Sequence, residues 1–260
     1  MISIENIAMS YATIPILERV SLDVETGSFC TIVGASGCGK STFLRLLLGQ
    51  EVATRGTIKV DGIEIAKEPH ADRGVVFQRY SVFPHLTVQG NLLLATDFEG
   101  SAVFGRLFGK RRRDAIDRCE VMLDSIGLSA ARDRYPAQLS GGMQQRLAIG
   151  QALLKQPRIL LLDEPFGALD PGVRADMHDL IDEIWREHAM TIFMVTHDIS
   201  EAFKLGTRLL VFDKVRDDPQ FPNAYGATIT YDLPIGSNDA ARREASEIFQ
   251  NHKTKKDNTP

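Results

Sequence analysis

The 260-residue sequence is poor in cysteine: Cys30, Cys38 and Cys119 are too few and too scattered for a disulfide framework or a zinc site. We expect free thiols in a reducing compartment. No apolar run approaches the roughly 18 residues of a membrane-spanning helix, and the first residues lack the basic and apolar regions of a signal peptide. The formal net charge is −4, so no positive field favours nucleic acid as a partner.

Apolar strands and amphipathic helices alternate along most of the chain, which predicts an α/β fold with a mostly parallel sheet and helices on its faces. Before this pattern, segments 2–9 and 17–25 predict antiparallel strands, and Asp61-Gly62 predicts a hairpin turn. The other expected strands are 29–34, 74–78, 158–163, 191–196, 208–212 and 227–233. The expected helices follow residue 40 and cover 142–154, 172–187, 199–205 and 239–249.

Between Tyr80 and about Gln138, helical periodicity replaces the alternation. One predicted helix carries an apolar stripe formed by Ala115, Cys119, Met122, Leu123 and Ile126. We therefore expect a helical subdomain inserted at about 80–138, within a single domain of residues 1–250. Residues 251–260 have little to bury and are expected to form a disordered tail.

A glycine-rich turn, GASGCGKST at 34–42, lies between a predicted buried strand and a helix and fits the pattern G-x-x-x-x-G-K-[ST]. Its glycines allow backbone amides to surround phosphate groups, its lysine can neutralise phosphate oxygens, and its first hydroxyl can reach Mg²⁺. This phosphate loop consists of Gly34, Ala35, Ser36, Gly37, Cys38, Gly39, Lys40, Ser41 and Thr42. A chance glycine-rich turn would lack this context, so the segment predicts a nucleotide site.

Polar residues follow three other predicted strands. Asp163 ends the strand RILLLD, where a carboxylate can hold Mg²⁺ through water, and the adjacent Glu164 can polarise an attacking water. His197 follows the strand TIFMVT; such a histidine is usually structural, but a parallel sheet would bring it to the phosphate-loop edge, where it could contact a γ-phosphate. Gln78 also ends a strand and could contact Mg²⁺ or the water.

The segment LSGGMQQR at 139–146 predicts a second anion site. Ser140 stands where a helix cap belongs, and Gly141 and Gly142 leave the backbone amides of the helix start accessible. The chain already has a phosphate cradle upstream, so a second site needs a separate explanation.

Together these motifs resemble the ATP-binding cassette (ABC) ATPases that drive ABC transporters, over nearly the whole chain. The resemblance implies a P-loop NTPase fold with an N-terminal antiparallel β subdomain, ATP hydrolysis, and ATP and Mg²⁺ as cofactors. It also explains the second anion site: two cassettes pack head to tail as a homodimer. Ser140, Gly141 and Gly142 of one chain then contact the γ-phosphate held by the other.

The resemblance implies further roles, residue by residue. Glu164 matches the catalytic glutamate, His197 the switch histidine and Gln78 the Q-loop. Asp170, in FGALD, matches the D-loop that signals between the two nucleotide sites. Tyr11 falls where an aromatic side chain stacks on adenine, although a lone tyrosine would ordinarily be interpreted as surface packing.

The segments LLLDEPFGALD and FPHLTV look most like the bacterial importer ATPases of the nitrate, sulfonate, taurine and bicarbonate group. This implies uptake of a small polar solute, through two integral membrane permease subunits and indirectly a solute-binding protein. It also implies a peripheral location on the cytoplasmic face of the inner membrane. The segment 213–234 is longer than the usual hairpin there and resembles members that accompany urea- or guanidine-using enzymes, which implies a nitrogenous solute such as urea or guanidine.

Four apolar residues near the Q-loop are candidates for the surface that receives the membrane subunit: Val82, Phe83, Pro84 and Leu86. Val82 and Leu86 could equally pack inside the helical subdomain. A soluble ABC ATPase of DNA repair or translation is the rival function, but one compact cassette and an acidic balance disfavour it. A non-hydrolysing scaffold is disfavoured because Lys40, Glu164 and His197 are all present.

The chain also departs from the family pattern. Ala35 replaces a proline common in importer phosphate loops, Arg79 follows Gln78 where an acidic or small polar residue is frequent, and Gln151 stands where an arginine is usual. Cys38 lies beside Lys40 at a helix start, which predicts a lowered thiol pKa and a reactive thiol that bound ATP protects.

Overall fold

The computed structural model describes residues 1–65, 68–77, 82–100, 109–216, 218, 220–221 and 224–235. The chain forms two compact units, one made of Met1–Pro69 with Thr191–Pro260 and the other of His70–Met190. Gln78, Arg79, the helix expected at 239–249 and the tail expected at 251–260 lie outside the described residues.

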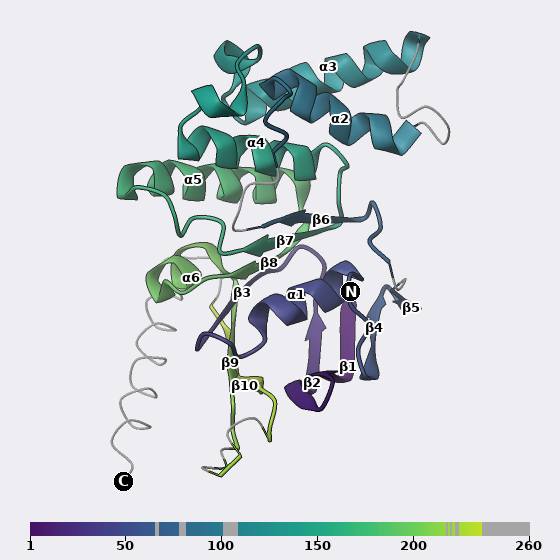
Figure 1. The fold of residues 1–260 in the computed structure, drawn as a ribbon, viewed down its shortest axis with the longest axis vertical. Coiled ribbons are helices and arrows are strands. Elements are labelled where there is room, and N and C mark those ends of the chain that lie inside the picture. The colour runs from purple at the N-terminus through teal and green to yellow at the C-terminus, as the bar shows by residue number, and fades with distance from the viewer. Residues whose placement is uncertain are drawn as a thin grey trace. The chain divides into compact units, whose positions relative to one another are not determined.

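The first unit begins with an antiparallel sheet in the order β2-β1-β4-β5 (Figure 1). Its strands are β1 (Ile2–Tyr11), β2 (Ile14–Val24), β4 (Arg55–Val60) and β5 (Ile63–Glu64). The turn between β4 and β5 is formed by Asp61 and Gly62, which both have positive φ, at 50° and 79°. Two residues with positive φ suit the twist of a two-residue hairpin, so the turn predicted from the Asp-Gly pair is confirmed.

A second sheet in this unit has the order β10-β9-β3-β8. Its strands are β3 (Phe29–Gly34), β8 (Thr191–Val195), β9 (Arg208–Asp213) and β10 (Thr228–Pro234), with β3 parallel to β8 and β9, and β10 antiparallel to β9. Helices α1 (Lys40–Leu48) and α6 (Ile199–Leu205) belong to the same unit (Figure 1). Phe43 of α1 packs against Phe193 and Phe212 of the sheet, at ring-centroid distances of 6.2 and 5.1 Å, and so fixes the helix after the phosphate loop.

The second unit contains a parallel strand pair and most of the helices. Its elements are β6 (Arg73–Val76), α2 (Val88–Gly100), α3 (Gly109–Ser125), the short helices η1 (Ser129–Ala131) and η2 (Pro136–Gln138), α4 (Gly141–Leu153), β7 (Ile159–Asp163) and α5 (Pro171–His188). The apolar stripe predicted on α3 is confirmed, because Ala115, Cys119, Leu123 and Ile126 are fully buried in one core cluster that Met122 packs against. Val82 packs against the same cluster, as the interior alternative for that residue predicted.

The antiparallel N-terminal sheet, the mostly parallel strands and the helices agree with the predicted fold class. Among the described residues, no helix combines the length and apolar character needed to cross a bilayer.

Candidate nucleotide site

The phosphate loop joins β3 to α1 and depends on two glycines that tolerate no side chain. A Cβ on Gly34 would lie 2.2 Å from the Phe212 carbonyl oxygen, and one on Gly39 would lie 2.7 Å from Leu17 Cδ2. Gly37 has open space around it but a φ of +78°, which L side chains rarely adopt. Gly39 precedes α1 in the left-handed conformation, so the loop turns sharply into the helix start. This is the backbone that a cradle of amides around a phosphate group requires.

Lys40 places its ammonium group inside this loop. Its Nζ donates to the Gly34 and Ala35 carbonyl oxygens at 2.8 and 2.9 Å, and the residue is only 5% exposed. The positive charge therefore lies at the start of α1. When a phosphate group binds, its oxygens can replace the two carbonyl oxygens as acceptors of the ammonium. The position agrees with the predicted role of this lysine in neutralising bound phosphates.

Cys38 corrects one expectation. Its thiol is buried, and burial raises its pKa above the ordinary value of 9.0, although the nearby Lys40 ammonium acts in the opposite direction. Desolvation outweighs the positive charge because the thiolate would have to exist in a largely water-excluded pocket. The predicted low pKa was wrong. Cys30 and Cys119 are buried as expected, and burial raises the pKa of Cys30 to about 12.

His197 lies at the same sheet edge as the phosphate loop. Ile32 of β3 pairs with Val195 of β8, and the Thr196 amide donates to the Ile32 carbonyl oxygen at 3.1 Å. The adjacent residues are fixed by side-chain bonds: Thr196 Oγ1 donates to Glu201 and accepts from the Asp198 amide, and Asp198 caps α6. His197 itself is exposed between these anchors. Contact of His197 with a γ-phosphate stays a prediction. The structure adds that the backbone on both sides of His197 is held by hydrogen bonds.

Tyr11 ends β1 and is 42% exposed. Its hydroxyl donates to the Glu51 carboxylate at 2.6 Å, and Glu51 also accepts from Arg45 Nη1 of α1 at 3.4 Å. The Tyr11 hydroxyl is therefore linked through Glu51 to Arg45 in the last turn of α1. Stacking of this ring on adenine stays a prediction.

In the second unit, Asp163 is the last residue of β7 and Glu164 follows it with a φ of +50°. A left-handed conformation is uncommon for glutamate and costs free energy that the surrounding structure must supply. The turn that imposes it is fixed by Phe166, which is 1% exposed and packs edge-on against the His178 ring at 5.0 Å. Glu164 thus lies in the turn directly after the strand end, and its role in activating water stays a prediction.

The segment 139–146 forms the helix start that the sequence predicted. Ser140 is the N-cap of α4, and its Oγ accepts from the Met143 amide at 3.3 Å. Ser140 and Gly141 are exposed, whereas Gly142 is buried. A Cβ on Gly142 would lie 2.3 Å from Val173 Cγ1 of α5. Sequence reasoning missed this packing role, since a glycine that lets two helices approach looks the same as one that exposes amides.

Asp170 is the N-cap residue of α5 and is exposed, three residues before Val173. The structure therefore brings the segment 139–146 and the Asp170 turn together within the second unit. It likewise brings the phosphate loop and His197 together within the first. Gln78, expected to act beside them, lies outside the described residues.

Sequence reasoning missed two buried carboxamides, Asn91 on α2 and Gln145 on α4. Asn91 is fully buried on α2, and Gln151 of α4 donates from Nε2 to the Asn91 carbonyl oxygen at 3.1 Å. Gln145 of α4 is also fully buried, and neither its Nε2 nor its Oε1 has a hydrogen-bond partner among the described residues. A polar residue on the apolar stripe of a predicted helix is the signal that could have identified Asn91 and Gln145.

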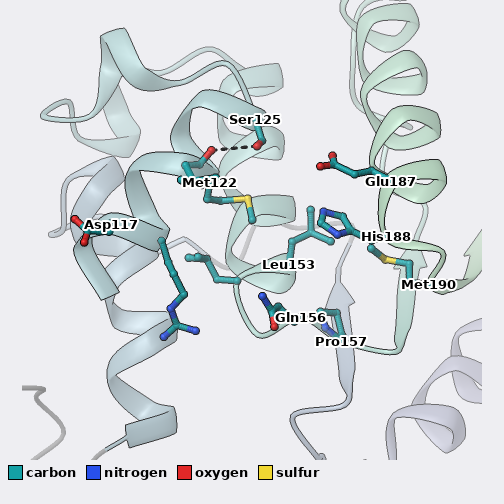
Figure 2. A pocket seen from close by; sticks show the side chains of 12 residues that line it. Asp117, Met122, Ser125, Leu153, Gln156, Pro157, Glu187, His188 and Met190 are labelled. Carbon is teal, nitrogen blue, oxygen red and sulfur yellow. Dashed lines mark hydrogen bonds between the residues drawn. The ribbon is translucent and has the colours of Figure 1, made fainter. Parts of the chain in front are cut away.

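A cavity of about 550 Å³ lies elsewhere in the second unit. Figure 2 shows Met122 of α3, Leu153 of α4 and His188 of α5 converging on it. None of the residues assigned to nucleotide or metal lines this cavity, so it is separate from the candidate nucleotide site.

The chain is similar to several known proteins. The family model described as ABC transporter matches residues 17–167. A nitrate import ATP-binding protein of Synechocystis is 43% identical over 195 residues, 75% of this chain and 70% of that protein. An aliphatic sulfonates import ATP-binding protein of Bacillus licheniformis is 39% identical over 235 residues, 90% of this chain and 83% of that protein.

Solved structures show the same fold. The dimeric structure of the bacterial ABC transporter cassette MJ0796 matches with a TM-score of 0.74 and 28% sequence identity. The match covers 92% of this chain and 100% of the MJ0796 chain. A dimeric post-hydrolysis state of the same cassette, bound to ADP and Pi, matches with a TM-score of 0.71.

Proposed function

Because this chain belongs to the ABC transporter family and hydrolyses ATP, we propose that it is the ATPase subunit of an importer for a small polar solute. The observation that carries the proposal is the phosphate loop, in which Lys40 is held inside a turn that leaves no room for a Cβ at Gly34 or Gly39. The similarity to a nitrate import ATP-binding protein and an aliphatic sulfonates import ATP-binding protein supports an oxyanion or similar solute. A nitrogenous solute such as urea or guanidine rests only on the long segment 213–234.

We assign roles within this site from the chemistry of each side chain. The loop 34–42 would hold the ATP phosphates. Mg²⁺ prefers oxygen ligands, and Ser41, Asp163 and Gln78 are the residues that would hold it. Glu164 would polarise the attacking water, and His197 would contact the γ-phosphate. The hard oxygen donors of Ser41 and Asp163 fit the ion, and the amide cradle fits the phosphates.

The exposed start of α4 supports a shared site between two copies of this chain. Ser140 and Gly141 face solvent, and a solved relative is a dimer bound to ADP and Pi. In our proposal the α4 start of one copy contacts the γ-phosphate on the partner's phosphate loop. Two permease subunits and, indirectly, a solute-binding protein complete the importer at the cytoplasmic face of the inner membrane.

Glu164→Gln tests the catalytic assignment. The amide keeps the size of the side chain but cannot accept a proton from water, so ATP hydrolysis should fall by about 10²–10⁴-fold while ATP binding persists. The matched control is Glu183→Gln, which changes an exposed carboxylate on α5 in the same way. Unchanged hydrolysis in Glu164→Gln would remove this residue from the mechanism.

Mixed dimers test the shared site. Ser140→Arg should block the contact with the partner's nucleotide, and Lys40→Ala should disable the phosphate loop, so each variant alone should lose hydrolysis. A mixture should regain activity, because one composite site per heterodimer remains intact. Heterodimers that form but hydrolyse no ATP would contradict the shared arrangement.

A further inference from the structure

The turn at residues 83–87, which we call the Phe83 loop, presents an apolar tip. Phe83, Pro84 and His85 are exposed, and the Phe83 and His85 rings meet edge to face at 6.0 Å. Leu86 and Thr87 are half-buried and lead into α2. An exposed apolar tip on a short turn needs a rigid frame if it is to keep one shape.

Asn91 supplies that frame from one turn inside α2. Its Nδ2 shares two N–H groups among the carbonyl oxygens of Phe83, Leu86 and Thr87, at 3.1, 3.1 and 3.0 Å. Its Oδ1 accepts from the Phe83 amide at 2.7 Å. One fully buried carboxamide thus satisfies backbone groups at both ends of the loop.

Gln151 connects this frame to α4. Its Nε2 donates to the Asn91 carbonyl oxygen at 3.1 Å and lies 3.4 Å from Asn91 Oδ1. The same Oδ1 accepts the hydrogen bond from the Phe83 amide. The same helix begins at Ser140, eleven residues earlier, which is about 16 Å along the helix axis at 1.5 Å per residue. The loop and the exposed start of α4 are therefore joined by hydrogen bonds and one continuous helix.

We propose that Asn91 and Gln151 are positioning residues that couple the Phe83 loop to the N-terminus of α4, so that a permease surface seated on the loop sets the position of Ser140. The proposal rests on the proposed function, which supplies the permease as the occupant. Gln151 acts as a donor: it must offer an N–H to two oxygens of Asn91. An arginine at this position would keep that donor.

The first experiment tests whether Gln151 stabilises the Phe83 loop. It measures the hydrogen-exchange rates of the backbone amides of residues 83–91 in the isolated cassette. Gln151→Leu removes the donor, and exchange of the Phe83 amide should rise about tenfold. Gln151→Arg should restore protection. The matched control is Gln89→Leu, which removes a half-buried donor from α2, the helix of Asn91; that donor bonds to Glu120 Oε1 at 2.8 Å. It should leave the Phe83 amide as in the wild type.

The second experiment compares ATP hydrolysis by the cassette alone with hydrolysis in the complex with its co-purifying permease, reconstituted in lipid nanodiscs. Gln151→Leu should leave the rate of the isolated cassette within about twofold and lower the permease-stimulated rate about tenfold. Gln151→Arg should recover the stimulated rate, and Gln89→Leu should match the wild type. Gln151→Glu should be impaired at neutral pH and partly recover as the pH falls, since only the protonated carboxyl can donate.

Three results would overturn the proposal: unchanged exchange at Phe83 in Gln151→Leu, an unchanged stimulated rate, or an equal loss of the basal and stimulated rates. Failure of the proposed function is recognised separately. In that case the wild-type cassette would show no stimulation by the permease, and Lys40→Ala would leave solute uptake intact.

Discussion

Gly142→Ala is the sharpest structural test of how α4 begins. The added methyl would lie 2.3 Å from Val173 Cγ1, closer than the 3.0 Å that real Cβ atoms essentially never breach. Either the Val173 side chain would have to leave its rotamer or the two helix starts would have to separate by about an ångström to restore ordinary contact. Overpacking of this kind costs about 1–3 kcal/mol, more than the gain of up to about 1 kcal/mol from replacing a helical glycine with alanine. We expect the free energy of unfolding to fall by about 1–2 kcal/mol.

The assay is urea or thermal unfolding of single variants and of the double variant with Val173→Ala. For a chain of this length, each 1 kcal/mol corresponds to a shift in Tm of about 2–4 °C. Removing the valine methyl groups should relieve the clash, so the double variant should be more stable than Gly142→Ala alone. The matched control is Gly172→Ala, where a Cβ would meet nothing within 4 Å. Equal destabilisation with and without Val173→Ala would refute the packing argument.

Two other perturbations follow from buried groups. Gln145→Met replaces a fully buried carboxamide that has no partner among the described residues, so unfolding should become less favourable by about 1–3 kcal/mol, as measured in urea; lower stability would contradict this. Burial raises the thiol pKa of Cys38 and takes that of Cys30 to about 12. The thiolate fraction at neutral pH is therefore smaller than for a thiol of pKa 9.0, so maleimide labelling measured by mass spectrometry should be slow at pH 7 and faster as the pH rises. Rapid labelling of Cys38 at pH 7 would contradict its burial.

Local chemistry made most of the fold predictable. The Asp61-Gly62 turn followed from the need for positive φ at two successive residues, and the α3 stripe followed from helical spacing. Ser140 could be placed because a helix start needs a side-chain acceptor. In each case the deciding interaction lies within a few residues along the chain, where a single sequence carries the information.

Contacts between distant segments could not be predicted in this way. The approach of Val173 to Gly142, the carboxamide pair of Gln151 and Asn91, and the burial of Cys38 all depend on which elements meet. The pKa of Cys38 shows the difficulty: the charge of Lys40 can be seen in the sequence, whereas the loss of water that outweighs it appears only once the loop is folded.

Asn91 bonds to the Phe83 loop only through main-chain atoms. These bonds therefore do not depend directly on the side chains at positions 83–85. Proline at position 83 is the exception, because it would remove the amide that Asn91 Oδ1 receives. Phe83, Pro84 and His85 can thus be exchanged while the backbone frame persists. If a permease docks on this tip as proposed, a few substitutions there would adapt the cassette to a different membrane partner and leave the nucleotide-binding loop and the start of α4 unchanged.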